Sequence, residues 1–143
     1  MRNLVLLAAV VCAALCVRHD APTFPQLDSY EVIAPASEKY NCIAWSVGVT
    51  DQWLWPDDGS LEAADRLNGR FGYHRLATLD YSPGDKILVY GVNGVVRHQC
   101  RMVNGEWTSK IGQDVVIRYR EAGALSGPDY GSPMAVYAHE KSR

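Results

Sequence analysis

Apolar and polar residues alternate through the middle of the chain in three consecutive runs. These runs cover residues 85–92, 95–103 and 106–111. Asn93-Gly94 and Asn104-Gly105 separate them, and Asn-Gly between alternating segments is a strong signal for a two-residue hairpin turn. The pattern therefore predicts a three-stranded antiparallel meander. Shorter apolar runs at Val115–Tyr119 and Met134–Ala138 are further strand candidates.

Helical spacing occurs earlier in the chain, at two places that each follow a preferred N-cap residue. Asn41 precedes the first helix, in which Cys42, Trp45 and Val49 share a face. Ser60 precedes the second. Its apolar face consists of Leu61, Ala64, Leu67 and Phe71. Because helices come first and strands follow, we expect an α+β fold with N-terminal helices packed on a small antiparallel sheet.

The composition fits one globular domain and excludes several classes of protein. The chain has 143 residues, of which 48% are hydrophobic, and a formal net charge of −2. A high apolar fraction with balanced charge argues against disorder, and without a basic run we expect no nucleic-acid partner. Three prolines punctuate residues 18–35, which we interpret as an extended arm. A single domain then occupies residues 36–143.

Residues 1–17 have the pattern of an export signal. Arg2 precedes an uncharged run that is apolar from Leu4 to Val17 and short for a membrane-spanning helix. We expect a signal peptide or an N-terminal anchor, and therefore an exported protein in the periplasm or outside the cell. Two alternatives are a lipid anchor on Cys16 and a misplaced start codon ahead of a cytosolic domain.

Two residues of the predicted domain have the chemistry of a thiol-dependent catalyst. Cys42 follows a predicted N-cap, where backbone N–H groups and the helix dipole stabilise a thiolate. Strand alternation turns His98 inward, and a Cys–His pair performs covalent acyl transfer. A structural thiol and a core histidine are the ordinary alternatives. The predicted inner face of this strand comprises Val96, His98, Cys100 and Met102, and its solvent face Arg97, Gln99 and Arg101.

Ser109 is the candidate for orienting the imidazole of His98. If Asn104-Gly105 forms a two-residue turn, Met102 pairs with Trp107 and Ser109 falls on the His98 face. Lys110 then points to the opposite face. It would replace Ser109 in this role only if the turn held one more residue, because a one-residue slip exchanges the faces of a strand.

Cys100 supports a competing interpretation, because it shares the predicted His98 face. In an oxidising compartment it could form a disulfide with Cys42, which would remove the nucleophile. A metal site made from Cys42, His98 and Cys100 lacks a fourth ligand and the usual paired spacing. We therefore expect no metal and no cofactor. The aromatic segment Trp53-Leu54-Trp55 is a candidate binding surface.

The order of these residues resembles the papain-like cysteine peptidase superfamily, most closely its NlpC-type and CHAP-type branch of cell-wall peptidases and amidohydrolases. Two motifs, Tyr40-Asn-Cys-Ile-Ala-Trp45 and Trp107-Thr-Ser-Lys-Ile-Gly112, also resemble a bacterial subgroup of that superfamily. The matching elements are Asn41-Cys42, Pro83-Gly84-Asp85, His98, Asn104-Gly105 and Ser109. Ser109 replaces the His, Asn or Gln that is common at the third position.

The resemblance implies that Cys42 attacks a carbonyl carbon, His98 transfers the proton and Ser109 steadies His98. The remaining candidates for the oxyanion site or for substrate binding are Tyr40, Asn41, Trp45 and Trp107. We expect a cysteine peptidase or amidase that acts on a peptide, with the peptides of peptidoglycan as the candidate substrate. The alternative is a catalytically inactive domain with a Cys42–Cys100 disulfide, which binds cell-wall fragments or a partner protein.

Overall fold

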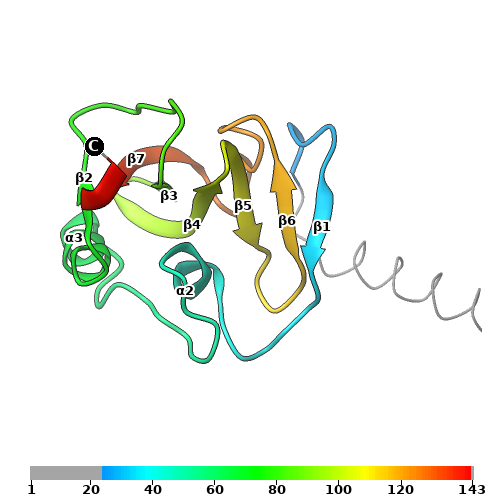
Figure 1. Cartoon of the computed structure of the whole chain (residues 1–143), viewed down its shortest axis with the longest axis horizontal. Helices are drawn as coiled ribbons and strands as arrows, with labels where there is room; N and C mark the ends of the chain where they lie inside the picture. The colour runs from blue at the N-terminus through cyan, green and yellow to red at the C-terminus, as the bar shows by residue number, and fades with distance from the viewer. Residues whose placement is uncertain (1–23, 143) are drawn as a thin grey trace, which may run out of the picture.

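The computed structural model describes residues 24–142, so the predicted leader at residues 1–17 lies outside the described residues. Within them, one seven-stranded antiparallel sheet has the strand order β1-β6-β5-β4-β3-β7-β2 (Figure 1). The strands are β1 (Glu31–Ala34), β2 (Tyr73–Arg75), β3 (Lys86–Val92), β4 (Val95–Val103), β5 (Glu106–Lys110), β6 (Val116–Tyr119) and β7 (Ser132–His139). The helices are α2 (Cys42–Ser46), α3 (Leu61–Gly69) and the 3-10 turn η1 (Glu140–Ser142).

The expected α+β arrangement, with helices packed on a small sheet, is wrong. The two α-helices of residues 24–142 span only five and nine residues, and the sheet forms most of the described fold. Two strands had no prediction: β1 falls inside the expected arm, and β2 lies between the second predicted helix and the meander. Both are edge strands of three or four residues. Their pairing depends on β6 and β7 and not on an alternating pattern of their own.

The meander and both helix starts are confirmed. Asn93 and Asn104 have φ values of 50° and 52°, and the glycine after each has a φ near 80°. Positive φ at both central positions defines the type I′ turn, whose twist matches that of the flanking strands. At the helices, the side chains of Asn41 and Ser60 accept hydrogen bonds from backbone N–H groups in the first turn, as N-caps do.

Both faces of the sheet are covered, and the two short helices pack on the same face. α2 contacts β4 and β5, whereas α3 contacts β2 and β4 (Figure 1). The core on the helix face contains Cys42, Ile43, Ala64, Leu67, Tyr73, Ile87, Val89, Val96, Ala135 and Tyr137. The core on the opposite face contains Leu88, Tyr90, Cys100, Met102, Trp107, Ile111, Ile117, Tyr119, Leu125 and Val136.

A β-bulge in β4 corrects the predicted faces of this strand. Tyr90 of β3 is opposite His98, but the next residue of β3 is opposite Val96, so Arg97 is an extra residue. Val96 therefore joins the helix-face core while His98 lies on the other face. The predicted solvent face is also wrong at Gln99, which is fully buried between the sheet and the helices.

The backbone at Gly131 lies very close to the backbone at Gly91, and this contact generates the first prediction. A Cβ atom on Gly131 would lie 2.2 Å from the carbonyl oxygen of Gly91, whereas a Cβ on Gly105 would have no heavy atom within 4 Å. Both glycines have φ values near 80°. We expect Gly105→Ala to lower the free energy of unfolding by about 1–2 kcal/mol, from backbone strain alone. Gly131→Ala should cost about 4 kcal/mol or more.

Urea denaturation of the two variants and of the unmodified chain measures this difference. Because the two positions share the same backbone conformation, Gly105→Ala is the control for strain. Equal losses of stability in the two variants would show that β3 and the segment before β7 do not approach each other as described.

Candidate functional site

α2 begins at Cys42 because Asn41 ties the helix start to a distant loop. The Asn41 side-chain oxygen accepts hydrogen bonds from the N–H groups of Ala44 and Leu54, at 3.1 and 3.2 Å. Its amide group donates to the Leu54 carbonyl oxygen at 2.7 Å. Both the oxygen and the amide nitrogen of the Asn41 side chain are thus used in holding the chain, and they place the buried Cys42 thiol at the first position of the helix.

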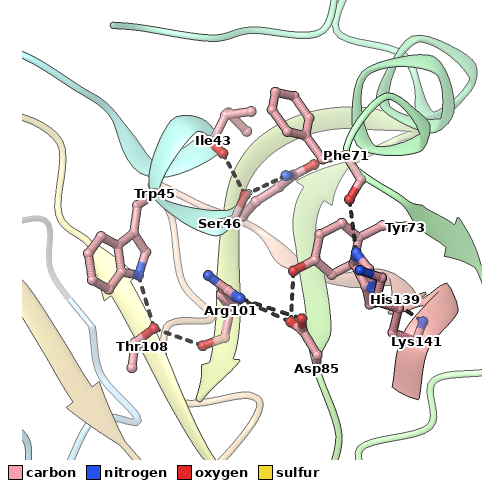
Figure 2. A network of polar contacts seen from close by, with 11 residues as sticks. Ile43, Trp45, Ser46, Phe71, Tyr73, Asp85, Arg101, Thr108, His139 and Lys141 are labelled. Atoms are coloured by element: carbon pink, nitrogen blue, oxygen red, sulfur yellow. Dashed lines mark hydrogen bonds and ion pairs between the residues drawn. The ribbon is translucent and has the colours of Figure 1, made fainter. Parts of the chain in front are cut away.

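A buried polar chain anchors α2 to the sheet. The Gln99 side-chain amide donates to the Ser46 hydroxyl at 2.8 Å and exchanges hydrogen bonds with the Asn68 amide of α3 at 3.0 and 3.1 Å. Ser46 in turn donates to the Ile43 carbonyl oxygen (Figure 2). All of these side chains are fully buried, so leaving one without its partner would cost about 1–3 kcal/mol.

A second contact connects α2 to β5. The Trp45 indole N–H donates to the Thr108 hydroxyl at 2.9 Å, and Thr108 donates to the Arg101 carbonyl oxygen (Figure 2). Arg101 reaches Asp85, which also accepts a hydrogen bond from the Tyr73 hydroxyl at 2.7 Å. This network crosses from β5 through β4 to β3 on the helix face.

β4 and β5 separate at the point where α2 contacts them. Their register runs from Val103–Glu106 to Arg101–Thr108, and it stops there although both strands continue. The predicted pairing of Met102 with Trp107 is confirmed. Residues 98–100 of β4 and 109–110 of β5 therefore lie beyond the paired part of the two strands, beside the start of α2.

His98 and Ser109 meet across this separation. The Nε2 atom of His98 forms a short hydrogen bond with the Ser109 hydroxyl, and both residues are fully buried. Tyr130 stacks on the imidazole, with ring centroids 3.9 Å apart and ring planes 5° from parallel. The other imidazole nitrogen, Nδ1, is buried and has no hydrogen-bond partner among residues 24–142. Buried polar atoms of this kind are uncommon and call for an explanation.

Cys42 is influenced by the backbone of β4 next to His98. The N–H group of Gln99, the residue that follows His98, favours the thiolate and so acts to lower the pKa of Cys42. Burial raises the pKa of Tyr130 and Cys100, and Cys42 adds to both shifts electrostatically. Cys42 therefore interacts through the separated strands with groups on the face where His98 lies.

Burial keeps the thiol and the imidazole uncharged at neutral pH. Desolvation raises the pKa of Cys42 to about 11, while hydrogen bonds from backbone N–H groups and the charge of Lys110 act in the opposite direction. Desolvation also lowers the pKa of His98 to about 3. The closed site thus holds a protonated thiol and a neutral imidazole. Cys42 and Cys100 are free thiols, without the disulfide that we considered from the sequence.

The other predicted site residues are engaged in structural contacts. Asn41 and Trp45 use their polar groups in the hydrogen bonds described above. Tyr40 is buried against α2, with its ring 6.3 Å from that of Trp45. Trp107 is 2% exposed and belongs to the core on the face opposite α2. The Trp45 indole N–H is used in its hydrogen bond to Thr108, whereas one N–H of the Asn41 amide donates to Leu54.

Sequence reasoning did not predict the stacking of Tyr130 on His98 or the burial of Gln99. It also did not predict the polar contacts that hold α2 on the helix face of the sheet. Tyr130 lies in a loop segment closed by two hydrogen bonds between Gly127 and Gly131, and no motif in this segment predicts a stack on His98. Gln99 appeared to belong to a solvent face because its two neighbours on that face are arginines. A polar residue between arginines gives no signal for a buried network.

Three hollows formed by described residues lie away from this cluster. Their volumes are about 510, 360 and 350 Å³, and neither Cys42 nor His98 lines any of the three. The largest is lined by Trp55 and residues of α3. Trp53 and Trp55 are 52% and 48% exposed, so the predicted aromatic segment is at the surface. His98 is fully buried and Cys42 is 7% exposed, so the Cys42–His98 region is shielded from solvent in this conformation.

Residues 24–142 contain neither a metal-binding cluster nor a membrane-spanning helix. No group of three or more His, Cys, Asp and Glu side chains lies close enough together to hold a metal ion. No helix in this part of the chain is long and apolar enough to cross a membrane.

These features define an antiparallel-sheet domain that buries a thiol on the helix face of the sheet and a hydrogen-bonded His–Ser pair on the other face. The chain belongs to the family described as "Domain of unknown function (DUF7689)", which matches residues 31–138. No curated protein and no solved structure matches the chain. The resemblance to papain-like peptidases stays a prediction.

The ionisation of His98 generates the second prediction. Its pKa is about 3 in the folded protein and about 6.5 in the unfolded chain, so the unfolded chain binds the proton first as the pH falls. Stability that is fully present above pH 6.5 is therefore lost as the pH falls toward 3. We expect a loss of roughly 1.4 kcal/mol per pH unit between pH 6 and 4 from this residue.

Urea denaturation across this pH range tests the expectation with His98→Gln, which does not titrate, as the comparison. Carboxylates contribute equally to both proteins, so the difference between the two slopes isolates His98. Parallel pH profiles would show that the imidazole is protonated as readily in the folded state as in the unfolded chain.

Proposed function

We propose that the protein is a thiol-dependent amide hydrolase in which Cys42 is the nucleophile and His98 the general base. The observation that carries the proposal is the state of the His98 ring. Its Nε2 atom is fixed by Ser109, and its buried Nδ1 atom has no partner among residues 24–142. An imidazole held in this way presents one nitrogen to a neighbouring acid, and the Cys42 thiol interacts with the adjacent residue of β4.

In the proposed reaction, His98 transfers protons during both the formation and the hydrolysis of a thioester. His98 Nδ1 accepts the thiol proton while the Cys42 sulfur bonds to the substrate carbonyl carbon. The imidazolium then gives this proton to the leaving amine as the C–N bond breaks, which produces a thioester. Water, deprotonated by His98, hydrolyses the thioester and restores the thiol. Ser109 is the positioning residue, because it fixes Nε2 and thereby the orientation of the ring.

The tautomer of His98 follows from this chemistry. Nδ1 can accept a proton only if the hydrogen of the neutral ring is on Nε2, where it is donated to the Ser109 hydroxyl oxygen. In the closed conformation the thiol pKa of about 11 and the imidazole pKa of about 3 keep the proton on sulfur. Reaction therefore requires an open form in which solvent or substrate replaces part of the protein that now covers the thiol and the imidazole.

Tyr130 is the side chain whose movement would open the site. It covers one face of the imidazole, it is partly exposed, and its segment is closed by the Gly127–Gly131 hydrogen bonds. We propose a peptide amide as the substrate, in peptidoglycan or in a protein, and export of the chain through its leader. The support for these two points is the sequence pattern of residues 1–17 and the motifs around Cys42 and His98.

A binding function is the second candidate, and the surface of the aromatic segment favours it. Trp53 and Trp55 are half-exposed, and Trp55 borders the largest of the three hollows described above. Such a domain would bind cell-wall fragments or a partner protein without using Cys42. Because Cys42 and Cys100 are free thiols, this candidate would not depend on a disulfide between them.

Covalent labelling at neutral pH tests the hydrolase proposal. We expect iodoacetamide, followed by peptide mass mapping of the full chain, to modify Cys42 far faster than the fully buried Cys100. Removing the base in His98→Ala should slow modification of Cys42 about a hundredfold, within the range of general-base contributions. Ser109→Ala should slow it by a smaller factor, since the ring loses only its orientation.

His74→Ala is the matched control, because His74 is an exposed histidine on the edge strand β2. It should label like the unmodified chain. Equal rates in His98→Ala and His74→Ala, or a Cys42 as inert as Cys100, would rule out the Cys–His pair and favour the binding function.

A further inference from the structure

Lys110 is a fully buried lysine on the same face of the sheet as α2. It follows Ser109 in β5, so its side chain points away from His98 and toward the helix face. The ammonium group donates hydrogen bonds to the carbonyl oxygens of Ser37 and Gly112, at 2.9 and 2.7 Å. It lies 5.1 Å from the centroid of the Tyr40 ring, two residues before Cys42.

The environment of Lys110 is unusual because it contains no paired carboxylate. No ion pair among residues 24–142 includes Lys110, although Asp114 acts on it from the following turn at longer range. Burial of an unpaired ammonium is unfavourable, and lysine is almost never fully buried unless it is paired. Two carbonyl oxygens and one aromatic ring solvate the cation only partly.

Lys86 shows the ordinary arrangement in the same sheet. It is also buried, at 5% exposure, but its ammonium group forms an ion pair with Asp80 at 3.1 Å. It also donates to the Ser82 hydroxyl at 2.9 Å. The two lysines thus differ in one respect that matters here, which is the presence of a fixed anion.

Cys42 is the ionisable group that faces Lys110 from α2. Thr108, two residues before Lys110 on the same face, holds Trp45 of α2, and Tyr40 lies beneath the ammonium group. Cys42 and Lys110 act on each other electrostatically, each favouring the charged form of the other. The remaining titratable neighbours of Cys42 are His98 and Cys100 of β4 and Tyr130, and none of them is a cation in the closed site.

We propose that Lys110 is a positioning residue that supplies the counter-charge for the Cys42 thiolate. The proposal rests on the proposed function, because it assigns the cation that stabilises the nucleophile once the site opens. Lys110 keeps its charge on the helix face, where Cys42 also lies, and His98 receives the proton on the other face. The thiolate would complete the pairing that Lys110 lacks in the closed form.

Alkylation of Cys42 in the full chain tests this role at pH 8–9, with iodoacetamide and peptide mass mapping. Lys110→Gln keeps a hydrogen-bond donor for the two carbonyl oxygens but removes the charge, and Lys110→Met removes both. A nearby opposite charge lowers a pKa by about one unit or more. We therefore expect alkylation at Cys42 to slow about fourfold, since a more basic thiolate is also a better nucleophile.

The direction of the change separates electrostatics from packing. If Lys110 were only structural, its removal would loosen the site and speed the alkylation of Cys42 and Cys100. Lys86→Met is the matched control, since it breaks a buried lysine ion pair elsewhere in the sheet and should leave the Cys42 rate unchanged. Lys110→Arg should retain most of the original rate. Faster or unchanged alkylation in both uncharged variants would overturn the proposal.

A reciprocal measurement applies even if the uncharged variants do not fold. Each group favours the charged form of the other. Replacing Cys42 by Ala should therefore lower the pKa of the Lys110 ammonium group, which an NMR titration at high pH measures. A Lys110 titration identical in Cys42→Ala and the unmodified chain would contradict the proposal. If Lys110 behaves as expected but His98→Ala labels normally, the proposed hydrolase fails while the Lys110 role stands.

Discussion

The position of α2 depends on the buried hydrogen-bond chain from Ser46 through Gln99 to Asn68. Helix α2 has only five residues and is too short to be stable alone, so its place on the sheet comes from tertiary contacts. Gln99 fixes the helix from β4, and Thr108 fixes it from β5 by accepting a hydrogen bond from the Trp45 indole. The backbone N–H of the same residue, Gln99, also favours the Cys42 thiolate, so one residue of β4 influences both the helix and the thiol.

This anchoring explains how residues on opposite faces of a sheet can act together. A continuous ladder between β4 and β5 would separate Cys42 from His98, but the ladder ends at Arg101–Thr108. The gap is closed on one face by the His98–Ser109 contact and on the other by α2. The result is a buried site in which the thiol and the imidazole are both neutral, and the proposed chemistry would depend on an opening at Tyr130.

Local sequence signals predicted the turns and the helix starts but not how the strands are arranged in the sheet. The Asn-Gly turns and the Asn41 and Ser60 caps depend on neighbouring residues, and each formed as predicted. The short edge strands β1 and β2 depend on distant partners, so their residues carried no period of their own. The bulge at Arg97 likewise results from pairing with β3, and it reversed the predicted face of Val96. The face of β5 on which Ser109 lies was predictable from the length of the Asn104-Gly105 turn. The contacts of Tyr130 and Lys110 are visible only in the packed structure.

The tautomer of His98 tests the central claim most directly, because only an unprotonated Nδ1 can accept the Cys42 proton. Long-range ¹⁵N NMR of the imidazole at pH 7 distinguishes a nitrogen that carries hydrogen from one that does not. The account predicts an unprotonated Nδ1, hydrogen on Nε2, and an Nδ1 signal that changes in Cys42→Ala. A protonated Nδ1, or a signal that is the same with and without the thiol, would contradict the account.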